Sequence, residues 1–272
     1  MSLDALRGFD MLWISGGHLL IAALAGLTGW GLFEWLESQM HHKEWNGFAF
    51  YDMIFPLFLF ISGVTWPFSF NKRKKNGQPM RRIYRHVFQR MILLVFFGFV
   101  YNGLLTLDFE NMRYASVLGR IGLAWFFAAI IVMHSDPKWW FVWLAGILLA
   151  YWALLSWIPV PGYGACNLTM EGSLVAYIDR MLLPGKLYRT VHDPEGILST
   201  LPAIGTALMG SITGNFLRKP DALVPRTRKF YVLLAAGLVS LLIGWLWGRV
   251  FPINKNLWTS SFVLFAGGWS LL

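Results

Sequence analysis

The sequence predicts an all-α membrane protein, in which a bundle of helices crosses a lipid bilayer about eight times. Hydrophobic residues make up 56% of the 272 residues, and the mean hydropathy is +0.52. Charged residues make up only 14%, against about 25% in ordinary soluble domains. So little charge cannot cover the surface of a soluble domain of this size. It can cover the two ends of a bundle whose sides face lipid.

Eight apolar segments approach the roughly 20 residues that a helix needs to cross a membrane. They are expected at residues 9–33, 48–70, 88–107, 115–133, 139–158, 197–217, 230–250 and 256–272. Helices are expected because a span in lipid must satisfy its own backbone hydrogen bonds, and the alternating ten-residue segments of a barrel are absent. We expect a single domain over residues 1–272. Its last apolar run reaches the final residue, so the bundle is expected to be incomplete at the C-terminus.

The distribution of basic residues predicts the orientation. The net charge of +9 would suggest a nucleic-acid partner in a soluble protein, but here the cations gather in a few short loops, so none is predicted. Fifteen of the 23 Lys and Arg residues lie at Arg7 or in the segments 71–90, 134–138 and 218–229. Positively charged loops usually face the cytoplasm, which places the N-terminus there. The loops at 34–47, 108–114, 159–196 and 251–255 are then expected to face outward.

The first outward loop and the span after it contain residues suited to acid–base chemistry. His41 and His42 end the loop, and histidine can take and return a proton near neutral pH. Asp52 lies about one turn inside the next span, where a buried carboxylate would fix the tautomer of a nearby histidine. The alternatives are two solvated loop histidines, and a structural ion pair for Asp52.

Three further residues are ambiguous in the same way. His18, within the first span, either forms a hydrogen bond between packed helices or lines a polar cavity. Arg120, about two turns into the fourth span, suits a phosphate or carboxylate partner, or it pairs with an acid of another span. Arg7, before the first span, is either an anchor at the cytoplasmic side or a contact for an anionic ligand.

The remaining candidates lie on the outward side. The 159–196 loop is long, and long ordered loops usually carry function. It holds Asp193 and Glu195, whose carboxylates suit the hydroxyl or ammonium groups of a sugar. Asn254 and Asn256 open the last span and either cap it or donate to the same outward cavity. No spacing of His, Cys or acidic residues predicts a metal site, and the single cysteine excludes an intramolecular disulfide.

Together these segments resemble the heparan-α-glucosaminide N-acetyltransferase family, including its bacterial members. Five stretches carry the resemblance in the family's order: Ser2–Gly8, Trp45–Pro56, Val117–Gly122, Tyr177–Arg180 with Asp193–Leu198, and Pro252–Trp258. The chain lacks the large lumenal domain and the later spans of the animal enzymes. Where their first catalytic span has an Asn, this chain has His18, and Gly119 replaces a Gln before the arginine.

The resemblance implies a transmembrane acyltransferase that moves acetyl from cytoplasmic acetyl-CoA to the amine of a glucosamine-type sugar on the outer face. The family's catalytic histidine precedes Trp-Asn-Gly, so the role falls to His42, with Asp52 orienting it. Arg7 and Arg120 are expected near acetyl-CoA. His18, Asn46, Asp193, Glu195, Asn254 and Asn256 are expected to contact the sugar.

A proton-coupled sugar or solute transporter is the alternative from another class, with Asp52 and His18 as its proton relay. A non-catalytic glycan-binding membrane protein is the third reading. The predicted partners are the lipid bilayer and a glycan acceptor, and no metal is predicted. The predicted location is the inner membrane of a bacterium, with many spans, and a homodimer is left open.

Overall fold

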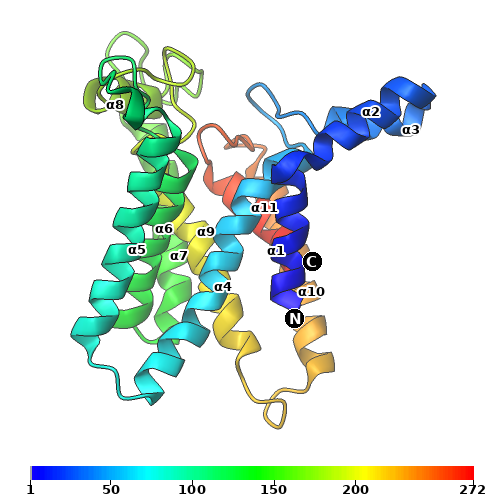
Figure 1. Ribbon diagram of the computed structural model, residues 1–272, viewed down its shortest axis with the longest axis vertical. Coiled ribbons are helices and arrows are strands. Elements are labelled where there is room, and N and C mark those ends of the chain that lie inside the picture. The colour runs from blue at the N-terminus through cyan, green and yellow to red at the C-terminus, as the bar shows by residue number, and fades with distance from the viewer. Residues whose placement is uncertain (1) are drawn as a thin grey trace.

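The computed structural model describes residues 2–272, and the regular structure of this part of the chain is helical (Figure 1). The α-helices are α1 (Ser2–Leu12), α2 (His18–Thr28), α3 (Gly31–Gln39), α4 (Ile54–Lys75), α5 (Met80–Tyr101), α6 (Val117–His134), α7 (Trp140–Trp157), α8 (Leu174–Leu182), α9 (Thr200–Leu217), α10 (Arg226–Trp247) and α11 (Ser260–Leu271). Short helical turns are η1 (Trp13–Gly17), η2 (Phe50–Met53), η3 (Leu104–Thr106) and η4 (Pro137–Trp139).

The predicted class of fold is confirmed, but the predicted count of eight spans is not. Six helical segments are long and apolar enough to cross a membrane: Leu3–Thr28, Phe50–Lys75, Met80–Tyr101, Val117–His134, Pro137–Trp157 and Arg226–Trp247. The predicted spans at 197–217 and 256–272 correspond to α9 and α11, which are not among them. The protein is therefore a polytopic helical membrane protein.

Helices α9 and α11 fail to qualify as membrane spans for different physical reasons. Most of α9 is buried by its neighbours, so it needs no lipid-facing apolar surface and carries Gly, Ser, Thr and Asn instead. Helix α11 has only 12 residues and is about 18 Å long at 1.5 Å per residue, shorter than the roughly 30 Å hydrocarbon layer. A hydropathy pattern reports contact with lipid, whereas these two helices mainly contact protein.

Glycines bring α4 and α9 into close contact at the centre of the bundle. A Cβ atom at Gly210 would lie 2.0 Å from the carbonyl oxygen of Phe60, and one at Gly63 would lie 2.0 Å from that of Ala207. Gly214 meets Val64 in the same way, at 2.1 Å. Small residues at such spacing allow helix backbones to approach in a membrane. The α4–α9 pair therefore forms a packed wall through the middle of the molecule.

The connections between helices gather at two ends of the bundle (Figure 1). The α4–α5 and α9–α10 connections lie at the lower end in this view, which we call the basic end. The 159–199 segment with α8 lies at the opposite, upper end, which we call the loop end. Helix α1 reaches the loop end and breaks at η1, where Gly16 has φ 118°, and α2 and α3 project away from the bundle.

Candidate active site

His42 and Asp52 meet at the loop end of the bundle. Nδ1 of His42 lies 2.8 Å from Oδ1 of Asp52, whose side chain is 1% exposed. The other oxygen, Oδ2, accepts hydrogen bonds from the backbone N–H of Ala49 at 3.0 Å and of Lys43 at 3.4 Å. The start of η2 therefore fixes the carboxylate. The carboxylate fixes the imidazole ring through Nδ1, and the His42 side chain is 49% exposed.

Lys255 completes this group, and the sequence analysis did not select it. Its Nζ lies 2.9 Å from Nδ1 and 3.2 Å from Nε2 of His42, and 3.4 Å from Oδ1 of Asp52. Burial lowers the pKa of Lys255, while the charges of Asp52 and Glu195 oppose the shift. A cation, a carboxylate and an imidazole therefore share one small site.

Three of the residues predicted to bind a sugar join the two segments that form this site. Nδ2 of Asn254 donates to Oδ1 of Asn46 at 3.1 Å, and Nδ2 of Asn256 donates to the carbonyl of Glu44 at 3.2 Å. The backbone N–H of Gly47 donates to the carbonyl of Ile253 at 2.8 Å. These contacts hold the Lys255 loop against the His42 segment, so the three asparagines position the site.

His18 contacts Tyr51, which in turn contacts His42. Its ring centroid lies 5.5 Å from that of Tyr51, and Tyr51 lies 4.8 Å from His42. Nδ1 of His18 is buried without a hydrogen-bond partner in the part of the chain that the structure describes. Tyr51 thus separates the two histidines.

The long loop is fastened by Arg113, a residue that the sequence analysis also missed. Its Nε lies 2.7 Å from Oδ2 of Asp193, its Nη2 lies 2.5 Å from Oδ1, and Nη2 also pairs with Glu195. Burial alone would raise the pKa of Asp193, but the Arg113 guanidinium outweighs it and holds that pKa below its usual range. Asp193 is fully buried. It therefore holds the loop in place and presents no surface to a sugar.

Arg120 lies with this outer group. It is 1% exposed, donates to the carbonyl of Gly196 at 3.2 Å, contacts Ser199 Oγ, and sits 5.0 Å from the ring centroid of Trp258. Its Nε and Nη1 lack partners among residues 2–272. These neighbours belong to the loop end, so Arg120 also lies at that end of the bundle.

Two more buried titratable groups lie beside the long loop. Burial raises the pKa of Asp179 to about 7, although the backbone N–H of Ile197 donates to its Oδ1 at 2.9 Å. Burial lowers the pKa of His192 to about 4. The His192 ring packs edge-on against Trp45 at 5.2 Å between centroids. Both groups are neutral for much of the range below pH 7, which suits their burial.

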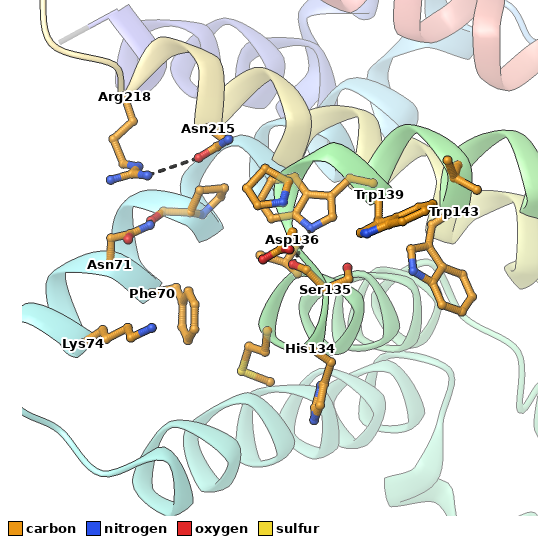
Figure 2. Close-up of a pocket in the computed structure, with 16 residues that line it drawn as sticks. Phe70, Asn71, Lys74, His134, Ser135, Asp136, Trp139, Trp143, Asn215 and Arg218 are labelled. Atoms are coloured by element: carbon orange, nitrogen blue, oxygen red, sulfur yellow. Dashed lines mark hydrogen bonds between the residues drawn. The ribbon is translucent and has the colours of Figure 1, made fainter.

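A cavity of about 790 Å³ lies at the basic end, far along α4 from His42 (Figure 2). Lys74 and Arg218 stand on one side of it, and Trp139 and Trp143 on the other. It contains none of the predicted site residues. Arg7, on α1, pairs with Asp4 at 3.2 Å. Within residues 2–272, no group of His, Cys, Asp and Glu side chains is arranged to hold a metal ion.

Fold and site together define a polytopic helical membrane protein with a histidine–carboxylate–lysine group at one end of its bundle. Residues 1–107 match a family described as "Domain of unknown function (DUF5009)". The chain is 27% identical to the heparan-alpha-glucosaminide N-acetyltransferase of Mus musculus over 281 residues, and 28% identical to that of Homo sapiens over 285 residues. The matches cover 82% of this chain and 42% of each relative.

The chain is therefore similar to the heparan-α-glucosaminide N-acetyltransferases, the family that its five motifs resemble. The matched region is about two fifths of the length of these relatives. One signal in the sequence pointed to Lys255: it lies between two selected asparagines in the Pro252–Trp258 motif. Nothing in the local pattern of Arg113 indicates its partners, because Asp193 lies 80 residues away.

Proposed function

We propose that this protein is a transmembrane N-acetyltransferase that moves acetyl from acetyl-CoA, supplied at the basic end, to the amine of a glucosamine-type sugar at the loop end. The observation that carries the proposal is the His42–Asp52–Lys255 group. The proposal is supported by the names of the similar proteins and by the separation of the basic end from the loop end. We place the basic end in the cytoplasm of a bacterial inner membrane, because positively charged loops usually face inward.

His42 acts as the general base. Oδ1 of Asp52 accepts a hydrogen bond from the protonated Nδ1 at 2.8 Å, so Nε2, beside the Lys255 ammonium at 3.2 Å, is the nitrogen that takes a proton from the acceptor amine. The amine nitrogen forms a bond to the acetyl carbonyl carbon, and the carbon–sulfur bond breaks. The proton then passes from His42 to the departing thiolate. Such catalysis typically contributes 10²–10⁴-fold.

Lys255 supplies positive charge where negative charge develops. Its ammonium lies within 3.2 Å of both ring nitrogens of His42, so it also borders the space in which the acetyl carbonyl meets the amine. A cation placed there stabilises the oxyanion that forms when the amine attacks.

Glu195 reaches this group from the long loop. It pairs with Arg113 and lies near enough to Lys255 to oppose the shift in its pKa. Its carboxylate is the one acidic group of the 193–195 turn with exposed surface, at 10%. We assign it to the amino sugar, whose ammonium group it can attract.

The test is transfer from labelled acetyl-CoA to a panel of amino sugars by the purified protein. His42→Ala should lose at least 100-fold in rate, and Asp52→Asn should lose most of it. His41→Ala is the matched control, because this neighbouring histidine is exposed and should keep the wild-type rate. Transfer by His42→Ala near the wild-type rate would exclude the mechanism, and uptake of sugar without acetyl-CoA would favour a transporter.

A further inference from the structure

The cavity at the basic end is formed where several membrane spans reach their ends. Its walls come from the last turns of α4, α6 and α9 and from the first turns of α7 (Figure 2). The apolar spans Phe50–Lys75 and Val117–His134 end beside it, and the span Pro137–Trp157 begins there. The cavity therefore lies at the level where the lipid-facing surface of the bundle gives way to polar surroundings. Its volume of about 790 Å³ is in the range of small-molecule sites.

Charges of both signs line this cavity. Figure 2 shows Lys74 and Arg218 on one side, and Asp136 between them and the tryptophan side chains. Nη2 of Arg218 donates a hydrogen bond to the neutral Oδ1 of Asn215 at 3.2 Å. In the described part of the chain, none of these three charged groups forms an ion pair. A ligand that carries both an anionic and a cationic group would match this arrangement of charges.

The wall that α7 contributes continues onto the lipid-facing side of the bundle. Trp139, Val142 and Trp143 line the cavity, and all three are exposed. Val142 lies five residues after the start of the span Pro137–Trp157, about 8 Å along the helix. Tryptophan is enriched at the boundary between lipid headgroups and acyl chains. Solvated charges at the end of a bundle need no ligand, but these charges border apolar surface that extends into the bilayer.

The cavity does not lead through the bundle to His42. It reaches Pro67 on α4, and about one turn further along this helix the backbones of α4 and α9 touch. A Cβ atom at Gly214 would lie 2.1 Å from the carbonyl oxygen of Val64. A long apolar arm of a ligand in the cavity can therefore leave along α7 toward lipid, and the α4–α9 contact closes the way inward.

We propose that this cavity binds the headgroup of an aminophospholipid, a lipid that carries a phosphate and a primary ammonium group. The phosphate lies at Lys74 and Arg218, which can donate charge-assisted hydrogen bonds to its oxygens. The ammonium lies at Asp136, and the acyl chains pass over Val142 and Trp143 into the bilayer. A nucleotide fits less well, because its several negative charges would face Asp136 and it has no apolar chain to cover α7. The site does not depend on the proposed function.

The experiment measures lipid binding by thermal unfolding of the full chain in detergent, followed by tryptophan fluorescence. Dioctanoyl phosphatidylethanolamine is titrated alongside phosphatidylcholine and phosphatidylglycerol of the same chain length. Because binding to the folded state stabilises it by mass action, the melting temperature should rise and saturate. The midpoint for phosphatidylethanolamine should lie about 10-fold below those of the other two lipids, because choline has no N–H to donate to Asp136 and the glycerol headgroup has no positive charge.

Two variants test the two ends of the headgroup. Asp136→Asn should remove the preference for phosphatidylethanolamine and leave the binding of phosphatidylglycerol in place. Lys74→Gln combined with Arg218→Gln should weaken the binding of all three lipids by about 10-fold or more, because the charged contacts to the phosphate are lost. Arg228→Gln is the matched control: it removes an exposed charge of α10 at the same end and should bind lipid as the wild type does.

Three outcomes would overturn the proposal. Equal midpoints for the three lipids in the wild type, or unchanged binding by both folded variants, would exclude recognition of the headgroup in this cavity. Full stabilisation by glycerophosphoethanolamine, which has the headgroup without acyl chains, would indicate a water-soluble phosphate compound in place of a lipid. Stronger stabilisation by coenzyme A than by any lipid, lost in the double variant, would assign the cavity to an anionic nucleotide.

Discussion

Replacing Lys255 by methionine should change the pH dependence of the proposed acetyl transfer more than it changes the fold. Methionine keeps the length of the side chain and removes only the charge, which lies 2.9 and 3.2 Å from the two nitrogens of His42. The attraction between this ammonium and an oxyanion at about 3 Å amounts to about 1.4 kcal/mol in water and about 5.5 kcal/mol at an effective dielectric constant of 20.

Because the His42 side chain is 49% exposed, the lower figure is the better guide. It corresponds to about a tenfold change in rate. Lys255→Met should therefore lower kcat/KM by at least about 10-fold at the pH where the wild type is most active. Burial lowers the pKa of Lys255, so the wild type should also lose activity at alkaline pH as the ammonium is lost. Lys255→Arg, which stays charged, should keep the acid limb and lose the alkaline one.

The measurement is the rate of acetyl transfer from pH 5 to 10 for the wild type and both variants, with melting temperatures to confirm folding. A Lys255→Met profile that superimposes on that of the wild type, at any level of activity, would refute the electrostatic role. A loss of activity with an unmoved profile would reduce Lys255 to a packing contact.

Three further substitutions test the residues that support the site. The stability of each variant is measured by thermal melting in detergent, followed by tryptophan fluorescence. Burial raises the pKa of Asp179 to about 7, so protonated Asp179 favours the folded state and this stability is lost as pH rises from about 4 to 7. Asp179→Asn should therefore gain stability relative to the wild type over the same range, and a constant difference in melting temperature between about pH 4 and 7 would contradict this. Arg113→Met leaves Asp193 and Glu195 without their ion-pair partner and should lower the free energy of unfolding by about 3–5 kcal/mol. Wild-type melting of this variant would show that other contacts hold the loop. Gly210→Ala should cost at least about 1–3 kcal/mol because its Cβ meets a carbonyl oxygen, and wild-type melting would show that α4 and α9 can separate freely.

The location of the candidate site was open to prediction because its elements carry local signals. A carboxylate one turn inside an apolar span is costly unless it has a partner, and a histidine ends the loop ten residues before it. These two facts mark Asp52 and the neighbouring His41 and His42 as candidates without any coordinates, and the family resemblance then selects His42. The separation of basic and acidic loops follows from counting charges.

The roles of the other candidates depended on contacts between distant segments. The carboxylate of Asp193 is a group that can bind a sugar, but it pairs with Arg113, which lies 80 residues away in the sequence. Arg120 was expected near the donor's phosphates. Helix α6 instead begins at the loop end, which brings Arg120 against Gly196 and Ser199. Charge alone identifies such residues as unusual and does not identify their partners.

The sequence by itself determined that this protein crosses the membrane as helices, because each lipid-facing helix must be apolar along its own length. It also determined which end carries positive charge. Only the tertiary structure decided that α9 is enclosed by protein, and that Lys255 joins His42 and Asp52 across 213 residues of chain. The physical reason is that hydropathy is a property of one segment at a time. Burial, ion pairing and the geometry of a site are properties of segments brought together.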